Sequence, residues 1–259
     1  MKKREQVNAI SELSGSAIGA AVGFGIGSVA AGPVGAMGGA VAGELVEKVF
    51  SWAGTEISNR LLSKRETKRV TTVMELAKQK IQSNLTDGKK LRDDEFFDKD
   101  NDRSTAEEIL EGTLFAAQKE YEERKLPYVA NLYANIAFDK EINREMADKL
   151  IKLSVDLTYR QLIIINVLGF AQSTGAKRKM DAYKEVNGAN NVSIASEIFE
   201  LYIKSVIFSS EAIVDAAGVN PSKLQLSGYG AWLYNLMELA KMPLSDNCTA
   251  DIVKFLGME

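Results

Sequence analysis

A stretch of 31 residues without a charge, between Glu12 and Glu44, constrains this chain most. It contains ten of the twenty glycines, and Pro33 marks a break inside it. Small residues at spacing four lie along one side of a helix and let a second backbone approach closely. Two such rows occur, Gly15, Gly19, Gly23 and Gly27 before the proline and Gly35, Gly39 and Gly43 after it, with Ile18, Val22 and Ile26 beside the first. This pattern predicts a glycine-zipper helical hairpin over residues 1–62.

The first row is long enough for a membrane span, because Leu13–Ala31 as a helix would measure about 28 Å. Glycine and alanine supply little transfer energy, so the segment is a weak stop-transfer sequence. Such a composition favours a segment that is soluble in one state and inserts as an oligomer in another. One alternative is a hairpin that only packs inside a soluble homo-oligomer. A second is a processed signal peptide, against which Glu5 and Glu12 argue because they interrupt its expected apolar region.

The rest of the chain reads as mostly α-helical, with only four prolines in 259 residues. Capping boxes, in which Ser or Thr is followed three residues later by Glu or Gln, predict helix starts at Ser63, Ser104 and Thr158. Gly88 should end the first of these helices, Pro127 should lie in the first turn of another, and an acidic loop covers 91–103. We therefore expect a helical body over 63–157.

Apolar residues at helical spacing support the helix predictions. One stripe before the body runs through Val41, Leu45, Val49, Ala53 and Ile57. The helix that starts at Ser104 should carry Ile109, Leu110, Leu114, Ala117 and Tyr121. Asn131 and Asn135 share one face of the next helix, where we expect them to serve helix packing.

Residues 158–259 are expected to form a degenerate winged-helix-like sensor module. Its first helix should end at Gly169, and a second should cover about 193–209. Alternation at Lys223–Leu226 predicts a short strand, after which Ser227 should cap a last helix. An order of helix, helix, short strands and a final helix is compatible with a degenerate module of this kind.

Common catalytic centres are excluded by composition, because the chain has no histidine and one cysteine, Cys248. This removes His-dependent nucleophilic catalysis, His-ligated metals, thiolate zinc and internal disulfides. We expect no enzyme activity, no cofactor and no metal; a carboxylate-based enzyme is the alternative. A calcium loop could use Asp100, Asp102, Ser104, Glu108 and Glu111, but Thr105 stands where that loop needs glycine.

A short basic run, Lys177, Arg178 and Lys179, gives the candidate contacts to an anionic ligand; the alternative is a solvated surface. The formal net charge of −3 argues against a general nucleic-acid binder but leaves open a nucleotide or a single-stranded oligonucleotide.

Four segments carry a resemblance to known proteins: LRDDEFFD (91–98), EERKLPYVANLYANIAF (122–138), LTYRQL (157–162) and LSGYGAWLYNLM (226–237). They resemble a little-characterised bacterial and prophage family, and the helical core is similar to abortive-infection alpha-type domains. The resemblance implies an anti-phage protein and supplies no catalytic residues. Membrane effectors of such systems pair a membrane-disrupting part with a sensor part, and nucleotide or oligonucleotide signals open some of them.

Together these patterns predict a membrane-disrupting effector, of channel or pore type, in bacterial abortive infection. A homo-oligomer would hold it inactive in the cytoplasm until a ligand releases it to the inner membrane, and a nucleotidyltransferase would be its partner. One rival is a soluble oligomeric scaffold or regulator that uses the glycine hairpin for assembly. Another is a DNA-binding winged-helix regulator.

Overall fold

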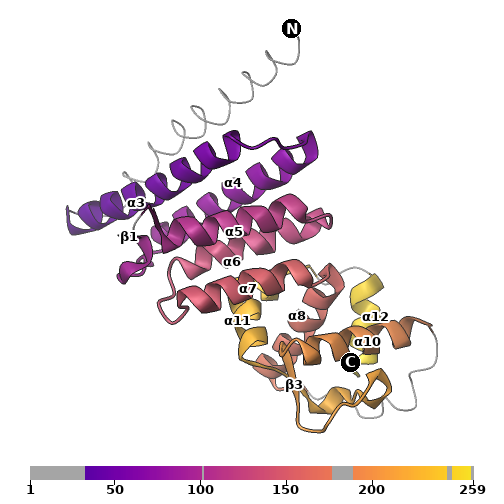
Figure 1. Cartoon of the computed structure of the whole chain (residues 1–259). Helices are drawn as coiled ribbons and strands as arrows, with labels where there is room; N and C mark the ends of the chain where they lie inside the picture. Colours follow the sequence, from indigo (N-terminus) through magenta and orange to yellow (C-terminus); the bar gives the residue numbers. More distant parts are fainter. Residues whose placement is uncertain (1–32, 101, 177–188, 244–246, 258–259) are drawn as a thin grey trace. The chain divides into compact units, whose positions relative to one another are not determined.

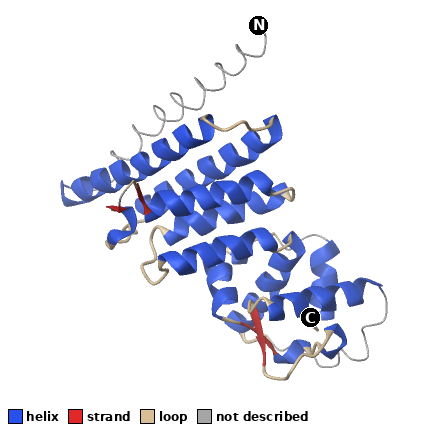
Figure 2. Ribbon diagram, viewed as in Figure 1, coloured by secondary structure: helices blue, strands red, loops and turns tan. Residues whose placement is uncertain are grey.

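The computed structural model describes residues 33–100, 102–176, 189–243 and 247–257. Nine α-helices and four very short strands occur in this part, so the expectation of a mostly α-helical protein is confirmed (Figures 1 and 2). The described residues form two compact units, one ending at Lys152 and the other beginning at Leu153. The division falls inside helix α7, Arg144–Asp156. The domain boundaries expected after residues 62 and 157 stay predictions.

The first unit is a layered helical bundle. Its elements are α3 (Pro33–Ser58), α4 (Lys64–Thr86), η2 (Glu95–Phe97), β1 (Lys99–Asp100), β2 (Arg103–Ser104), α5 (Thr105–Lys119), η3 (Glu123–Lys125), α6 (Leu126–Ile136) and the start of α7. Helix α4 packs on α5 and α6, and α3 packs on α5 and α4 (Figure 1). Helix α6 contains no charged residue and buries seven of its eleven residues, which makes it a central element of the bundle core.

All three capping boxes are confirmed. At Ser63 the backbone N–H donates to Glu66 over 2.8 Å, and the serine hydroxyl accepts from the Glu66 N–H. Ser104 with Glu107 and Thr158 with Gln161 repeat both bonds. Helix α4 ends at Thr86, just before Gly88 with φ +82°. Pro127 lies in the first turn of α6, as expected.

Two apolar stripes differ from expectation. In α3 the buried apolar side chains are Val46, Val49, Phe50 and Ala53, whereas Val41 is 62% exposed. A strict spacing of four advances about 40° per step around a helix, so the expected stripe winds out of the core. Helix α5 ends at Lys119, before Tyr121, and that tyrosine is 77% exposed.

The second unit is built around α8 (Tyr159–Thr174), whose residues 161–169 are all buried. Its other elements are α10 (Ala189–Ile203), β3 (Ile207–Ser209), η4 (Ala216–Gly218), η5 (Pro221–Lys223), β4 (Leu224–Leu226), α11 (Gly228–Leu236), η6 (Leu239–Lys241) and α12 (Asn247–Phe255). Strands β3 and β4 pair antiparallel, with Phe208 opposite Gln225. The predicted strand and the Ser227 cap are confirmed.

Two helix ends in this unit were predicted wrongly. Helix α8 does not stop at Gly169 but continues to Thr174 and ends on Gly175, whose φ is +67°. Gly169 instead makes room for a ring, because a Cβ there would lie 2.5 Å from Tyr234. Helix α10 ends at Ile203, and the left-handed Ser205 (φ +57°) turns the chain into β3, so Ile207–Ser209 is strand rather than helix.

Among the described residues, no single helix has the length and hydropathy of a membrane span. Helices α7 and α8 pass that test only as a bent pair, by length and composition alone.

Candidate functional site

The attachment of α3 to the bundle is the candidate site, because α3 carries the second glycine row into the described structure. Gly35, Gly39 and Gly43 all lie in this helix, and Gly43 is buried. About two turns later, Phe50 meets the buried ring of Tyr133 from α6 edge-on, with ring centroids 6.0 Å apart. The glycine row and the apolar stripe therefore belong to one helix held by one core.

An ion pair reinforces this attachment in the middle of α3. The Nζ of Lys78 on α4 lies 2.9 Å from Oε2 of Glu47, in an orientation that makes the contact an ion pair without an aligned hydrogen bond. The Lys78 side chain is 6% exposed and that of Glu47 34%. Lys78 also lies 6.0 Å from the centre of the Phe50 ring. Because the Lys78 side chain is buried, removing Glu47 would leave it without the carboxylate that it contacts.

A second polar contact holds the chain just beyond the end of α3. Arg60 donates to Oε1 of Glu111 on α5 over 2.5 Å, and Arg103 donates to the other carboxylate oxygen over 2.5 Å. The Arg60 guanidinium also lies 4.1 Å from the centre of the Phe115 ring. Glu111 therefore joins the α3–α4 connection to β2 through α5.

Tyr133 brings a polar group into the core beneath α3. The Tyr133 hydroxyl donates to the carbonyl oxygen of Ala106 over 3.4 Å. Burial, and secondarily the negative charge of Glu107, raise the pKa of Tyr133 well above its ordinary value. The phenol therefore stays protonated at all physiological pH values and serves packing, not proton transfer.

A hollow of about 610 Å³ surrounds Arg92. The Arg92 guanidinium donates to Asp94 and to the carbonyl oxygens of Ile136 (3.4 Å) and Ile142 (2.8 Å), and it lies 4.5 Å from the centre of the Phe96 ring. The hydrogen bonds from Arg92 lower the pKa of Asp94. The hollow is lined by Asp93, Asp94, Glu95 and Asp98 against Arg92, Lys140 and Arg144. Since the protein itself uses the Arg92 donors, this hollow is poorly suited to an anion.

A smaller hollow of about 380 Å³ lies between α5 and α7. Ile109, Gly112 and Ile151 line it together with charged residues, among which Arg144 pairs with Glu108 at 2.6 Å. Sequence reasoning missed both hollows, because each depends on contacts between residues far apart along the chain.

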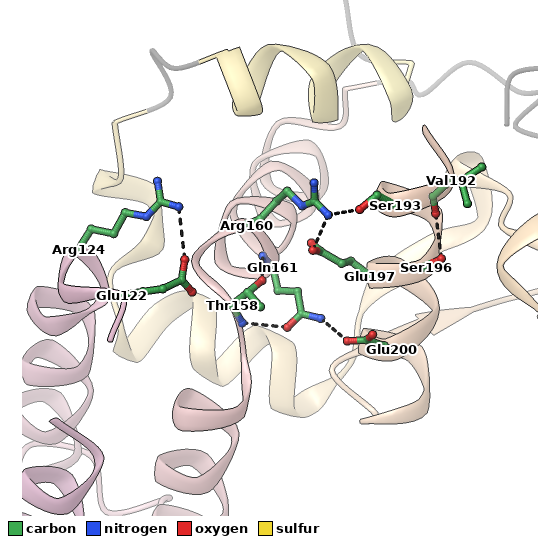
Figure 3. A network of polar contacts seen from close by, with 10 residues as sticks. All are labelled: Glu122, Arg124, Thr158, Arg160, Gln161, Val192, Ser193, Ser196, Glu197 and Glu200. Atoms are coloured by element: carbon green, nitrogen blue, oxygen red, sulfur yellow. Dashed lines mark hydrogen bonds and ion pairs between the residues drawn. The ribbon is translucent and has the colours of Figure 1, made fainter. Parts of the chain in front are cut away.

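In the second unit a polar network ties α8 to α10 (Figure 3). Arg160 donates to the Ser193 hydroxyl and to Glu197, the latter over 2.6 Å. Gln161 accepts the Thr158 N–H over 3.0 Å and donates to Glu200 over 2.9 Å. Gln161, whose side chain completes the capping box of α8, thus also binds α10. No motif in the sequence marks this network, whose partners lie 33 to 39 residues apart.

Several predicted site residues fall outside the described part: Gly15, Ile18, Gly19, Val22, Gly23, Ile26, Gly27, Lys177, Arg178 and Lys179. In the described ranges no group of three His, Cys, Asp or Glu side chains is placed to hold a metal ion. The calcium-loop candidates have other contacts: Ser104 caps α5, while Glu108 and Glu111 pair with arginines. Asn135 accepts from Asn84 on α4 over 3.0 Å, in keeping with a packing role.

Comparison of the sequence and the structure with protein-family models, with curated proteins and with solved structures gives no match.

Proposed function

We propose that this chain is a membrane-disrupting effector, of channel or pore type, that acts in bacterial anti-phage abortive infection. One observation supports it best: a single helix, α3, contains both Gly35, Gly39 and Gly43 and the apolar stripe that the bundle buries. A movement of α3 would therefore carry the glycine-rich segment with it. The sequence resemblance to abortive-infection proteins supplies the biological setting of the proposal.

The glycine-zipper hairpin of residues 1–62 is the membrane-active part of this proposal. Gly19, Gly23 and Gly27 would make close helix contacts between copies, because their missing side chains leave space for a partner backbone. In the inactive homo-oligomer these faces cover one another, and in the active state they line the contacts of an assembly in the inner membrane. The protein would be cytoplasmic before activation, and no catalytic step or cofactor is needed.

The second unit is proposed as a winged-helix-like sensor. Helices α8 and α10, the antiparallel pair β3–β4 and helix α11 follow one another in an order that is compatible with a degenerate module of this kind. Helix α10 carries Glu197 and Glu200, which would repel the phosphates of duplex DNA. This disfavours a transcriptional regulator. Lys177, Arg178 and Lys179 are the proposed contacts to a nucleotide or single-stranded oligonucleotide, which a partner nucleotidyltransferase would supply.

Dye leakage from liposomes tests the proposal, with Gly23→Leu compared with Gly54→Leu. Gly23 belongs to the first spacing-four row, before α3, whereas Gly54 lies in α3 and belongs to neither row. A Cβ placed on Gly54 would have no atom within 4 Å, so the control substitution has space. We expect Gly23→Leu to abolish leakage and cellular toxicity, and Gly54→Leu to retain both. Unchanged leakage in Gly23→Leu would refute the zipper. No leakage from the wild-type protein in any ligand state, with a changed oligomer mass in Gly23→Leu, would favour the soluble scaffold.

A further inference from the structure

Two loops of the first unit meet at one end of its bundle. They are residues 59–69, the α3–α4 connection with the first turns of α4, and residues 118–125, the end of α5 with its connection to α6. We call them together the basic end. Arg65 donates to Glu123 over 2.9 Å, and Arg69 donates to the carbonyl oxygen of Gln118 over 3.2 Å. Gln118 in turn donates to Glu66 over 3.0 Å. These bonds fix the two loops side by side.

The basic end has the opposite charge to the whole chain. It holds eight Lys or Arg and four Glu residues, a net formal charge of +4, while the chain has −3. Its four carboxylates are engaged: Glu66 with Gln118, Glu120 with Lys125, Glu122 with Arg124, and Glu123 with Arg65 and Arg69. Glu111 of α5 pairs with Arg60 from outside this set, and counting it leaves a balance of +3. Meanwhile Lys64, Lys68 and Lys119 are exposed. The field that leaves this surface is therefore positive.

Large apolar side chains project from the same loops. Leu61 is 105% exposed and Tyr121 is 77% exposed, so neither contributes to the core. Leucine and tyrosine at loop tips, surrounded by lysine and arginine, are suited to the boundary between lipid headgroups and acyl chains.

Two exposed cations at this end are placed unfavourably for the helix that carries them. Lys64 and Arg65 occupy the first turn of α4, where the helix dipole favours negative charge. Glu66 alone in that turn has the favourable sign. Cations placed against the dipole, next to apolar side chains left in solvent, indicate a role in binding.

We propose that the basic end is a docking surface for the anionic face of a lipid bilayer. Lys64, Lys68 and Lys119 lie against lipid phosphates, and Leu61 and Tyr121 enter the headgroup region. A nucleic acid would also attract the cations, but it offers nothing to an exposed leucine. This surface belongs to the described bundle, so it goes beyond the proposed glycine segment. It lies at the Ser58 end of α3, about 38 Å along the helix from Pro33. Docking there would bring the cytoplasmic protein to the inner membrane before the glycine segment inserts.

Vesicle sedimentation of the full-length protein tests this surface. The probes are phosphatidylcholine vesicles with and without about one third phosphatidylglycerol. The test variant is Lys64→Glu/Lys68→Glu, in which a glutamate in the first turn of α4 also agrees with the helix dipole. The matched control, Lys90→Glu/Lys254→Glu, makes the same charge change at exposed positions elsewhere. Circular dichroism melting checks that both variants fold.

The wild-type protein and the control should bind the anionic vesicles and release them in high salt. Each cation near an anionic surface contributes about a fivefold factor in affinity, so the test variant should bind at least about 20-fold more weakly. Leu61→Ser should also weaken binding. Equal binding to both vesicle types, or equal losses in test and control variants, overturns the proposal. The proposal is also overturned if the protein binds a single-stranded oligonucleotide through these lysines but binds no vesicle.

Vesicle binding and leakage test the docking surface and the proposed pore separately. Gly23→Leu should keep salt-sensitive vesicle binding while losing leakage. If the glycine segment alone held the protein on vesicles, Gly23→Leu would lose binding and Lys64→Glu/Lys68→Glu would keep it, which contradicts the docking surface.

Discussion

The Nζ of Lys125 lies 2.5 Å from Oε2 of Glu120, and the two side chains are 2% and 5% exposed. Glu120 follows the last residue of α5, and Lys125 precedes α6 directly. The other Glu120 oxygen accepts the N–H of Glu122 over 2.8 Å. A buried ion pair therefore closes the turn that carries Tyr121 into solvent.

Breaking this pair from one side should be costly. Lys125→Met leaves the Glu120 carboxylate buried and unpaired, so the free energy of unfolding should fall by about 3–5 kcal/mol. Glu120→Gln/Lys125→Met removes both charges and should recover most of that loss. The neighbouring Arg124 is 57% exposed in its side chain, so Arg124→Met should cost less than about 1 kcal/mol. Urea denaturation measures all three. Equal losses in Lys125→Met and Arg124→Met would contradict a stabilising role for the buried pair.

Acid should weaken the start of α4 through Glu66. Hydrogen bonds from Ser63, and next from Gln118, lower the pKa of Glu66 from 4.5 to about 2. The folded state therefore binds the proton less well than the unfolded state. This contribution to stability is present above pH 4.5 and disappears as the pH falls toward 2.

Glu66→Gln isolates that effect, because glutamine keeps the capping box but does not titrate. Its melting temperature should fall less than that of the wild type between pH 4.5 and 2. Glu75→Gln, an exposed position on the same helix, should leave the wild-type pH dependence in place. Identical pH profiles for Glu66→Gln and the wild type would refute this assignment.

Gly169 should not accept a side chain. A Cβ there would lie 2.5 Å from two ring carbons of Tyr234, so Gly169→Ala should lower the free energy of unfolding by about 1–3 kcal/mol. Gly112 in α5 has no atom within 4 Å of its Cβ position, so Gly112→Ala should raise it by about 0.5–1 kcal/mol. Thermal denaturation distinguishes the two signs. Stabilisation by both substitutions would mean that Tyr234 moves away freely.

The ion pair under α3 should set how readily the proposed pore forms. Glu47→Gln leaves buried Lys78 without its counter-ion and should weaken the attachment of α3 by at least about 1 kcal/mol. Leakage of liposome contents should then rise about fivefold or more. Glu44→Gln is the matched control, because Glu44 pairs with Lys48 on the solvent side of the same helix, both 67% exposed. A fall in leakage in Glu47→Gln would show that attached α3 is the active form.

Local features of this fold could be predicted. The starts of α4, α5 and α8 follow from Ser63, Ser104 and Thr158, because a capping box forms its bonds within four residues. The same holds for the end of α4 before Gly88 and for the first turn of α6 at Pro127. The glycine rows predict close helix contacts for a similar reason, since spacing along a helix fixes which residues share a face.

Tertiary contacts decided the rest. Gly169 has the sequence context of a helix stop, but Tyr234, 65 residues later, fills the space beside it and α8 continues. Arg160 and Gln161 bind Glu197 and Glu200, which lie 37 and 39 residues later, and no local sequence pattern predicts that pairing.

The sequence by itself determined a helical chain with a glycine-rich N-terminal segment and without the residues of common catalytic centres. The tertiary structure alone decided that α3 rests on the bundle, that Lys125 and Glu120 are buried together, and that Leu61 and Tyr121 emerge at one charged end. The physical reason is the separation along the chain between the residues that interact. Capping bonds and helix faces depend on neighbours within a turn or two, whereas burial and charge pairing depend on which distant segments share a surface.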